Sequence, residues 1–170
     1  MKIVNQEDDD EKLRQEFQAL RQSLKTVQLA TIGADGNPEA SYAPYVWIES
    51  YYYLYLSELA RHTRNLITNP AISLLLIETE EKSNNLFARQ RIILQGKVIR
   101  IGRETDRFQL VMAEFRSRFG GFIDVIEPLQ DFHLFQIRPQ SGRFIRGFAQ
   151  AYDLVGPKLD EFTRFDTRNR

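Results

Sequence analysis

The sequence contains no cysteine and only two histidines, His62 and His133. The absence of cysteine excludes disulfides, thiolate metal sites, c-type haem attachment and cysteine nucleophiles. With two histidines, a multi-histidine zinc or iron site within one chain is not expected. A serine–histidine–acid triad is not expected either, because neither histidine falls in a pattern that places it beside both an acid and an activated serine.

The chain also lacks net charge, a long hydrophobic run and a basic leader. Its 23 Lys and Arg balance 23 Asp and Glu, which removes the main electrostatic argument for binding nucleic acid or an anionic membrane. The longest apolar stretch, residues 71–77, is too short to span a bilayer. The first dozen residues are acidic and polar, unlike a signal peptide. We therefore expect a cytoplasmic protein with no nucleic-acid or membrane partner.

What the chain does contain is an ordinary globular composition of one-domain size. Its 170 residues are 42% hydrophobic and 27% charged, which favours a folded chain over a disordered one. We expect a flexible acidic N-terminus over residues 1–11, one domain over residues 12–153 and a charged C-terminal tail over residues 154–170.

Hydrophobic periodicity predicts three helices and a series of antiparallel strands. The predicted helices cover residues 10–25, 59–68 and 108–119. The predicted strands cover residues 27–32, 40–48, 51–56, 72–77, 89–101, 132–137 and 144–148. Between the last helix and the last two strands, residues 120–130 are expected to form a loop with a short turn of helix. The pattern is typical of an α+β, mostly β fold: a small antiparallel barrel of six or seven strands with peripheral helices.

Two details of this prediction concern glycine. Gly96, inside the strand 89–101, indicates a bulge or a close approach by another segment. The residues Gln140, Ser141 and Gly142 are predicted to turn the chain between the strands 132–137 and 144–148, so that these two strands form a closing hairpin.

The densest group of candidate functional residues lies at the start of the short predicted helix that follows the strand 51–56. It consists of Arg61, His62, Thr63 and Arg64. Helix N-termini offer free amide hydrogens and partial positive charge, so this cluster favours a pocket for a phosphate or a carboxylate. A solvated helix face capped by Ser57 or Thr63 is the structural alternative, and the spacing alone does not choose between them.

A second group of candidates is aromatic. It consists of Tyr42, Tyr45, Trp47, Tyr51, Tyr52, Tyr53 and Tyr55. Strand alternation places Tyr51, Tyr53 and Tyr55 on one face and Tyr52 on the other. Such a wall would suit a flat ring ligand. It would equally suit a hydrophobic core or a dimer interface, which are the commoner roles of aromatic residues.

The second histidine lies in the predicted strand 132–137, between two apolar residues. A lone histidine in such a position is usually a hydrogen-bonded structural residue. We therefore expect a structural role for His133, and we do not expect the nearby Asp131 to orient it.

Several of these segments resemble a known family. Residues 61–75, Arg91 and residues 95–98 resemble the FMN-binding split barrel of pyridoxamine 5′-phosphate oxidase. Residues 57–66 and 143–152 resemble more closely the haem-utilisation branch of that superfamily, the HugZ/HutZ type. The resemblance covers roughly residues 12–153, which makes this segment the split-barrel domain.

The resemblance implies a homodimer of split barrels with a small-molecule cofactor in the clefts between subunits. In the oxidase, an Arg-Lys pair before an Asn-Pro turn binds the FMN phosphate, and the matching positions before residues 69–70 hold Arg61 and His62. A glutamine that contacts the flavin in the oxidase matches near Arg91. The expected cofactor-binding residues are therefore Ser57, Arg61, His62, Thr63, Arg64, Arg91 and Tyr45.

Members of the haem-utilisation branch bind haem through a histidine in the C-terminal tail, and residues 153–170 contain none. His62, His133 or a tyrosinate is left as a ligand of the haem iron, and we favour His62 because it lies in the basic cluster. Three classes of function stay open: a haem-binding or haem-degrading protein, a flavin-dependent oxidoreductase, and a dimeric ligand carrier without catalysis. The resemblance favours the first, and the cofactor is haem or FMN.

Overall fold

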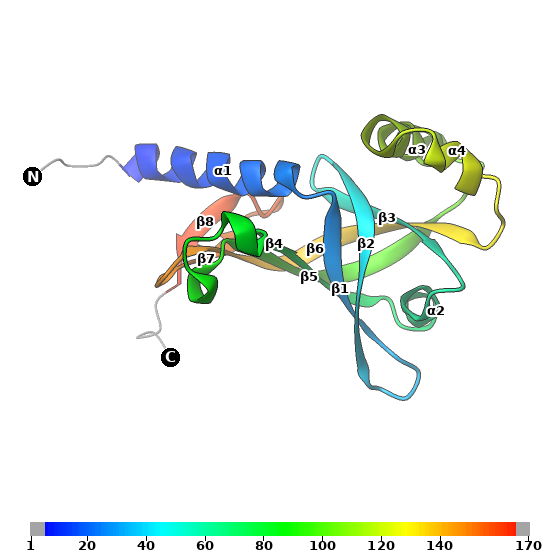
Figure 1. Ribbon diagram of the computed structural model, residues 1–170, viewed down its shortest axis with the longest axis horizontal. Helices are drawn as coiled ribbons and strands as arrows, with labels where there is room; N and C mark the ends of the chain where they lie inside the picture. The colour runs from blue at the N-terminus through cyan, green and yellow to red at the C-terminus, as the bar shows by residue number, and fades with distance from the viewer. Residues whose placement is uncertain (1–5, 166–170) are drawn as a thin grey trace, which may run out of the picture.

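The structure is a computed structural model and describes residues 6–165 (Figure 1). In chain order its elements are α1 (Gln6–Ser23), β1 (Thr26–Ile32), β2 (Pro38–Ile48), β3 (Tyr51–Ser57), α2 (Arg61–Thr68), β4 (Ala71–Ile77), the 3-10 helices η1 (Glu80–Lys82) and η2 (Leu86–Ala88), β5 (Arg91–Ile101), α3 (Asp106–Phe119), α4 (Phe122–Ile126), β6 (Phe132–Gly147), β7 (Gln150–Val155) and β8 (Glu161–Arg164).

Six of the strands close into an antiparallel barrel. Their order is β3-β2-β1-β4-β5-β6, and β3 also pairs with β6, which joins the two edges of the sheet. Strands β5 and β6 have 11 and 16 residues, so they extend beyond the barrel and carry β7 and β8 at one side (Figure 1). The prediction of a mostly β, α+β fold with a small antiparallel barrel and peripheral helices is confirmed.

The barrel interior and α1 share one hydrophobic core. Buried and exposed residues alternate strictly along β1, so its apolar side chains Val27 and Leu29 both point inward. The apolar residues of α1, including Leu13 and Phe17, recur at helical spacing and pack on this interior. Phe17 meets Phe144 of β6 edge-on, with ring centroids 5.8 Å apart. The helix therefore lies along the long strands, as Figure 1 shows.

A second core lies between the outer face of β2, β3 and β6 and the helices α3 and α4. Helix α3 begins after Thr105, whose Oγ1 accepts a hydrogen bond from the Phe108 amide at 3.2 Å. It ends at Gly120, where a φ of 76° is accessible to glycine at little cost. Tyr53 and Tyr55 face this second core, whereas Tyr52 faces the barrel interior. The predicted alternation of the tyrosines is confirmed, and these three are core residues of a single chain.

The close approach predicted at Gly96 is present. The register of β5 against β6 shifts between Gln95 and Gly96. A Cβ atom added at Gly96 would collide with the carbonyl oxygen of Arg138 and would lie 3.2 Å from the Cα of Pro139. Glycine at this position therefore lets the two long strands come together across the bulge.

The hairpin predicted around residues 140–142 is wrong. These residues do not turn, because β6 runs without interruption from Phe132 to Gly147. Ser141 pairs with Gln95 and Gly142 with Leu94 in the ladder to β5. Gly142 is needed for close packing rather than for a turn, since a Cβ atom there would lie 2.7 Å from a methyl group of Leu154. The chain turns after Gly147 instead, and β7 follows at residue 150.

The two ends of the chain hold more regular structure than the sequence indicated. Helix α1 begins at Gln6 rather than at residue 10, and β7 and β8 occupy residues 150–164. The short helix expected within residues 120–130 is α4. The division into residues 1–11, 12–153 and 154–170 stays a prediction. None of the helices within residues 6–165 is long and apolar enough to cross a membrane.

Candidate functional site

The predicted basic cluster forms the first turn of α2, directly after β3. Ala60 occupies the cap position, and no side chain caps the first amides of the helix. Neither Ser57 nor Thr63 therefore acts as the cap that the structural alternative required. The uncapped turn keeps the partial positive charge of a helix N-terminus next to two arginines.

The two arginines of this turn are exposed and differ in their contacts. Arg61 lies 3.2 Å from a carboxylate oxygen of Glu39, with 71% of its side chain exposed. Arg64 donates a hydrogen bond of 2.8 Å to the carbonyl oxygen of Glu58, so its charge is not neutralised by a carboxylate. Both guanidinium groups are thus able to meet an anion at the surface.

The hydroxyl of Thr63 is the one atom of the cluster that is buried without a partner. The residue is fully buried, and its Oγ1 makes no hydrogen bond to the described residues. A buried hydroxyl without a partner costs free energy, and Thr63 lies too deep to contact a group bound at the surface. The hydroxyl of Ser57, in contrast, already has protein partners. Its Oγ donates a hydrogen bond to Asp131 at 2.6 Å and accepts one from the Leu59 amide at 3.1 Å.

His62 is held as a neutral, oriented imidazole. Its Nδ1 lies 2.9 Å from the Oγ of Ser41 on β2. Burial lowers the pKa of His62 below its usual value of 6.5, and the nearby Glu39 only partly opposes this. Its Nε2 makes no hydrogen bond within the described part of the chain. A neutral imidazole with one oriented nitrogen and one open nitrogen is the form that binds a metal ion.

His133 has the structural role that its sequence context predicts. It is buried, and its Nε2 hydrogen-bonds a carboxylate oxygen of Glu58. Asp131 makes no hydrogen bond to His133 within the described residues and accepts the hydrogen bond from Ser57 instead. The partner Glu58 was missed, because it lies far from His133 in sequence and comes next to it only through the pairing of β3 with β6.

Two expected cofactor residues lie away from this cluster in a single chain. Tyr45 is fully buried and donates a hydrogen bond of 2.6 Å to the carbonyl oxygen of Arg21. Burial raises the pKa of the Tyr45 hydroxyl far above its ordinary value of 10.0. Arg91 begins β5 and pairs with Ile77 at the far end of β4, whereas α2 joins β4 at Ala71. The two ends of β4 are six residues apart, and at the rise of a strand this is a distance of about 20 Å.

The match to a protein family agrees with this fold. A family model described as pyridoxamine 5′-phosphate oxidase matches residues 13–146. The chain belongs to the pyridoxamine 5′-phosphate oxidase family. The predicted resemblance to this family is thereby confirmed.

Within the pyridoxamine 5′-phosphate oxidase family, the chain is similar to proteins named HutZ and ChuZ. It is 40% identical over 167 residues to heme oxygenase HutZ of Vibrio cholerae serotype O1, covering 98% of this chain and 95% of HutZ. The crystal structure of HutZ, described as a heme storage protein, matches 74% of this chain and 89% of that chain with a TM-score of 0.71. ChuZ of Campylobacter jejuni matches at 31% identity with a TM-score of 0.83, over 94% of this chain and 65% of that chain.

Of the site residues expected for this family, the structure brings Ser57 and residues 61–64 together and leaves Arg91 and Tyr45 apart. It adds Ser41 and Glu39, which contact His62 and Arg61 from β2. Their polar side chains on a strand are the only sequence signal for them. Ser41 lies 21 residues before His62, and the two come together only through the sheet. No group of three or more metal-ligating residues gathers within residues 6–165.

Proposed function

We propose that this protein binds haem and degrades it. The observation that carries the proposal is the 40% identity to heme oxygenase HutZ over 98% of the chain. HutZ is also described as a heme storage protein, so storage without degradation is the second candidate. Both candidates share the binding step, and the α2 cluster supports that step.

The α2 cluster suits the carboxylates of haem. Arg61 and Arg64 offer exposed guanidinium groups, and α2 adds an uncapped first turn. Carboxylates bind such arrangements through charge-assisted hydrogen bonds.

His62 suits the haem iron. Its imidazole is kept neutral by burial and oriented by Ser41, and its Nε2 is open. His133 fits less well, because its Nε2 already bonds Glu58 inside the protein. Bound haem would supply a redox-active iron. The residues of this chain would orient the haem, hold its carboxylates at α2 and keep the coordinating imidazole unprotonated.

Absorption spectroscopy tests this assignment. Purified protein titrated with haem is expected to show a Soret band, and His62→Ala should abolish the spectrum of the imidazole complex while His133→Ala keeps it. The opposite result would move the ligand to β6. An unchanged spectrum in both variants would show that neither histidine binds the iron.

The contribution of Arg61 to haem binding is tested by measuring the affinity for haem. A charge-assisted hydrogen bond is worth on the order of 1.5–3 kcal/mol, so Arg61→Ala should weaken haem binding roughly ten-fold or more. Lys12→Ala, which removes an exposed positive charge from α1, is the matched control and should bind as the parent does. Equal affinities in the two variants would place the carboxylate site elsewhere.

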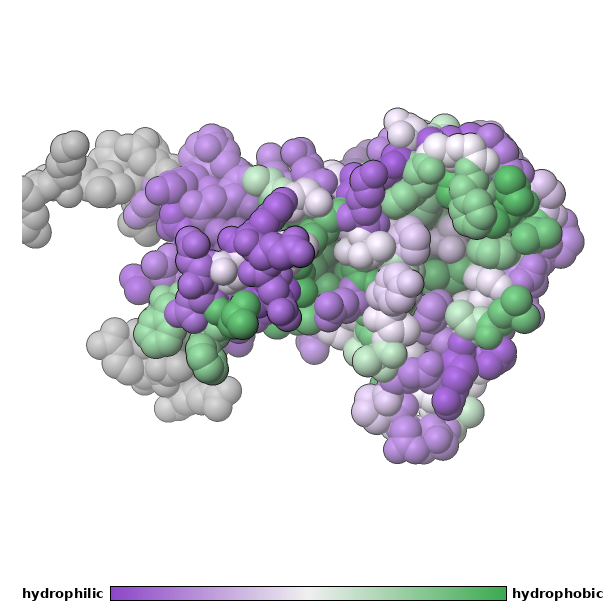
Figure 2. All heavy atoms as spheres, viewed as in Figure 1, coloured by the Kyte–Doolittle hydropathy of each residue, from purple (hydrophilic) through white to green (hydrophobic). Residues whose placement is uncertain are grey.

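A homodimer would complete the site. The outer face of β4 and β5 carries apolar side chains, among them Leu75, Ile77 and Ile93, that belong to neither core and are half-buried in the single chain. Figure 2 shows hydrophobic surface near the centre of the view, where β4 and β5 run in Figure 1. We propose that a second copy of the chain covers this face.

A two-fold axis near the middle of this face would also explain the position of Arg91. The face has α2 and Ala71 at one end and Arg91 at the other. Two-fold symmetry exchanges these ends, so Arg91 of one copy would lie near α2 of the other. A hollow of about 390 Å³ lies on the same face, lined by residues of β1, β4 and β5 that include Ala71 and Lys97. This hollow supports a cofactor cleft between the copies.

Light scattering tests the dimer. The chain mass is 19.9 kDa, and the parent protein should scatter with about twice that mass at micromolar concentration. Leu75→Lys should reduce the mass to that of one chain. Leu110→Lys, on the exposed side of α3, should leave the dimer intact. A parent protein that is monomeric at micromolar concentration would reject the proposal.

An FMN-dependent oxidoreductase is the alternative, and the basic turn of α2 supports it because a flavin phosphate would fit the same arginines. A protein purified with FMN would show absorption bands in the blue and the near ultraviolet rather than a Soret band. Arg91→Gln, which introduces the glutamine of the oxidase, should then strengthen FMN binding. The cytoplasmic location expected from the sequence also stays a prediction.

A further inference from the structure

A pocket separate from the α2 cluster lies between α1, the β2–β3 turn and the β7–β8 turn. Its volume is about 340 Å³, which is within the range of small-molecule sites. Three aromatic residues, Phe17, Tyr52 and Phe162, form its walls together with Leu94 and Leu159. None of its lining residues belongs to α2, so it is not part of the proposed haem site.

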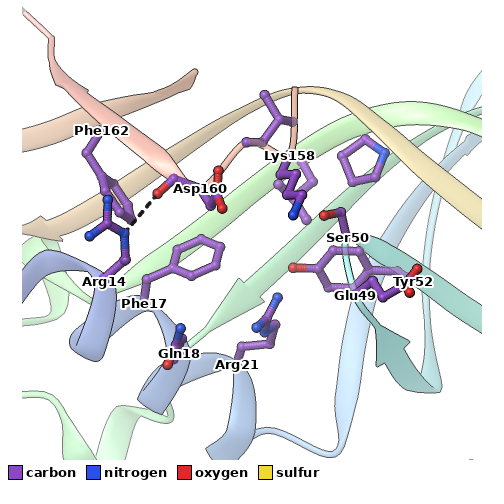
Figure 3. A pocket seen from close by; sticks show the side chains of 13 residues that line it. Arg14, Phe17, Gln18, Arg21, Glu49, Ser50, Tyr52, Lys158, Asp160 and Phe162 are labelled. Carbon is purple, nitrogen blue, oxygen red and sulfur yellow. Dashed lines mark hydrogen bonds between the residues drawn. The ribbon is translucent and has the colours of Figure 1, made fainter. Parts of the chain in front are cut away.

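Arg21 of α1 points into this pocket (Figure 3). Its guanidinium carbon lies 4.9 Å from the centre of the Trp47 ring and 5.5 Å from the centre of the Phe17 ring. Its Nε is buried and makes no hydrogen bond to the described residues. A guanidinium group that lines a pocket, stacks on aromatic rings and has no carboxylate partner in the described part of the chain is able to bind an anion.

The charges around the pocket are unbalanced toward the positive. Lys158 points into the same space from the β7–β8 turn (Figure 3). Within residues 6–165, neither Arg21 nor Lys158 has a carboxylate within 4.0 Å. Of the two acidic lining residues, Glu49 lies 3.9 Å from Arg107 outside the pocket. An adjoining hollow of about 350 Å³ shares Lys158 and adds Arg138.

We propose that this pocket binds a small aromatic carboxylate. The ring system would lie against the wall formed by Phe17, Tyr52 and Phe162, where it replaces water at an apolar surface. The carboxylate would bond the guanidinium of Arg21, with Lys158 closing the mouth. The aromatic walls select a flat ring, and the unpaired cations select the acid over a neutral or cationic compound.

The single tryptophan of the chain reports on this site, because Trp47 packs on Arg21. We would titrate haem-free protein with β-naphthoate and follow the indole signal of Trp47 by proton–nitrogen correlation NMR. The neutral isostere β-naphthamide is the matched ligand control. The acid should shift the indole signal saturably and bind at least roughly ten-fold tighter than the amide. Equal binding of acid and amide would overturn the proposal.

Two variants locate the anion contact. Arg21→Met keeps an apolar stem over Trp47 and removes the charge, and it should weaken β-naphthoate binding roughly ten-fold or more without changing the affinity for the amide. Lys158→Met lies in an exposed turn, so it tests the pocket even if the Arg21 variant does not fold. Lys82→Met, on the exposed 3-10 helix η1, is the control and should bind as the parent does. Parent-like affinity for the acid in both pocket variants would overturn the assignment.

Discussion

Replacing Gly96 by alanine should destabilise this protein through the contact between its two longest strands. A Cβ atom at this position would collide with the carbonyl oxygen of Arg138 and lie 3.1 Å from the carbonyl carbon. Both atoms are backbone, so a side chain cannot move aside, and β5 or β6 must shift at the bulge. Overpacking of this kind costs about 1–3 kcal/mol.

A smaller effect opposes this cost. Alanine restricts the unfolded chain more than glycine does, which stabilises a strand by about 0.5–1 kcal/mol. The free-energy cost of the clash exceeds this entropic gain because the clash involves the backbone. We therefore expect a net loss of about 1–2 kcal/mol in the free energy of unfolding. For a chain of this length that corresponds to a decrease in Tm of about 2–8 °C.

Thermal unfolding followed by circular dichroism measures the effect, with all samples at one protein concentration because a dimer makes Tm concentration-dependent. Gly147→Ala is the matched control: it lies in the same strand β6 that Gly96 contacts, and a Cβ atom there meets nothing within 4 Å. Its Tm should equal or slightly exceed that of the parent. A Gly96 variant as stable as the Gly147 variant would refute the assigned contact.

Three further predictions concern single side chains. Tyr45→Phe removes the hydrogen bond to the Arg21 carbonyl and should cost about 1–2 kcal/mol in urea unfolding; an unchanged midpoint would contradict this. Arg103→Ala removes hydrogen bonds to three carbonyls within residues 127–132, and should cost about 2–4 kcal/mol and speed hydrogen exchange in that segment. Because burial holds the pKa of His62 below 6.5 in the folded state, the unfolded state binds more protons as pH falls below that value, so stability should decrease there. His62→Gln should remove that part of the pH dependence, as measured by urea unfolding at several pH values.

Local patterns in the sequence were enough to predict most of the helices and strands. The run of β-branched and apolar residues along 27–32 and the helical spacing along α1 and α3 each depend on near neighbours, so local patterns reveal them. The basic turn at residues 61–64 was found for the same reason, since its members are consecutive. The close approach at Gly96 was predicted correctly because glycine weakens the interior of a strand, and it usually occurs there where a bulge or a neighbouring backbone leaves no room for a side chain.

Pairing between distant segments decided the features that local patterns did not predict. Turn-forming residues at 140–142 lie in the middle of β6, because ladders on both sides hold them extended and outweigh their local preference. The pairing of β3 with β6 places Glu58 beside His133, and the pairing of β1 with β2 and packing of α2 place Ser41 beside His62. Arg21 is a candidate ligand-binding residue only because the β7–β8 turn lies against α1 in the tertiary structure and forms a pocket with it. These contacts span from 21 to more than 100 residues of sequence, and no local pattern carries information over such distances.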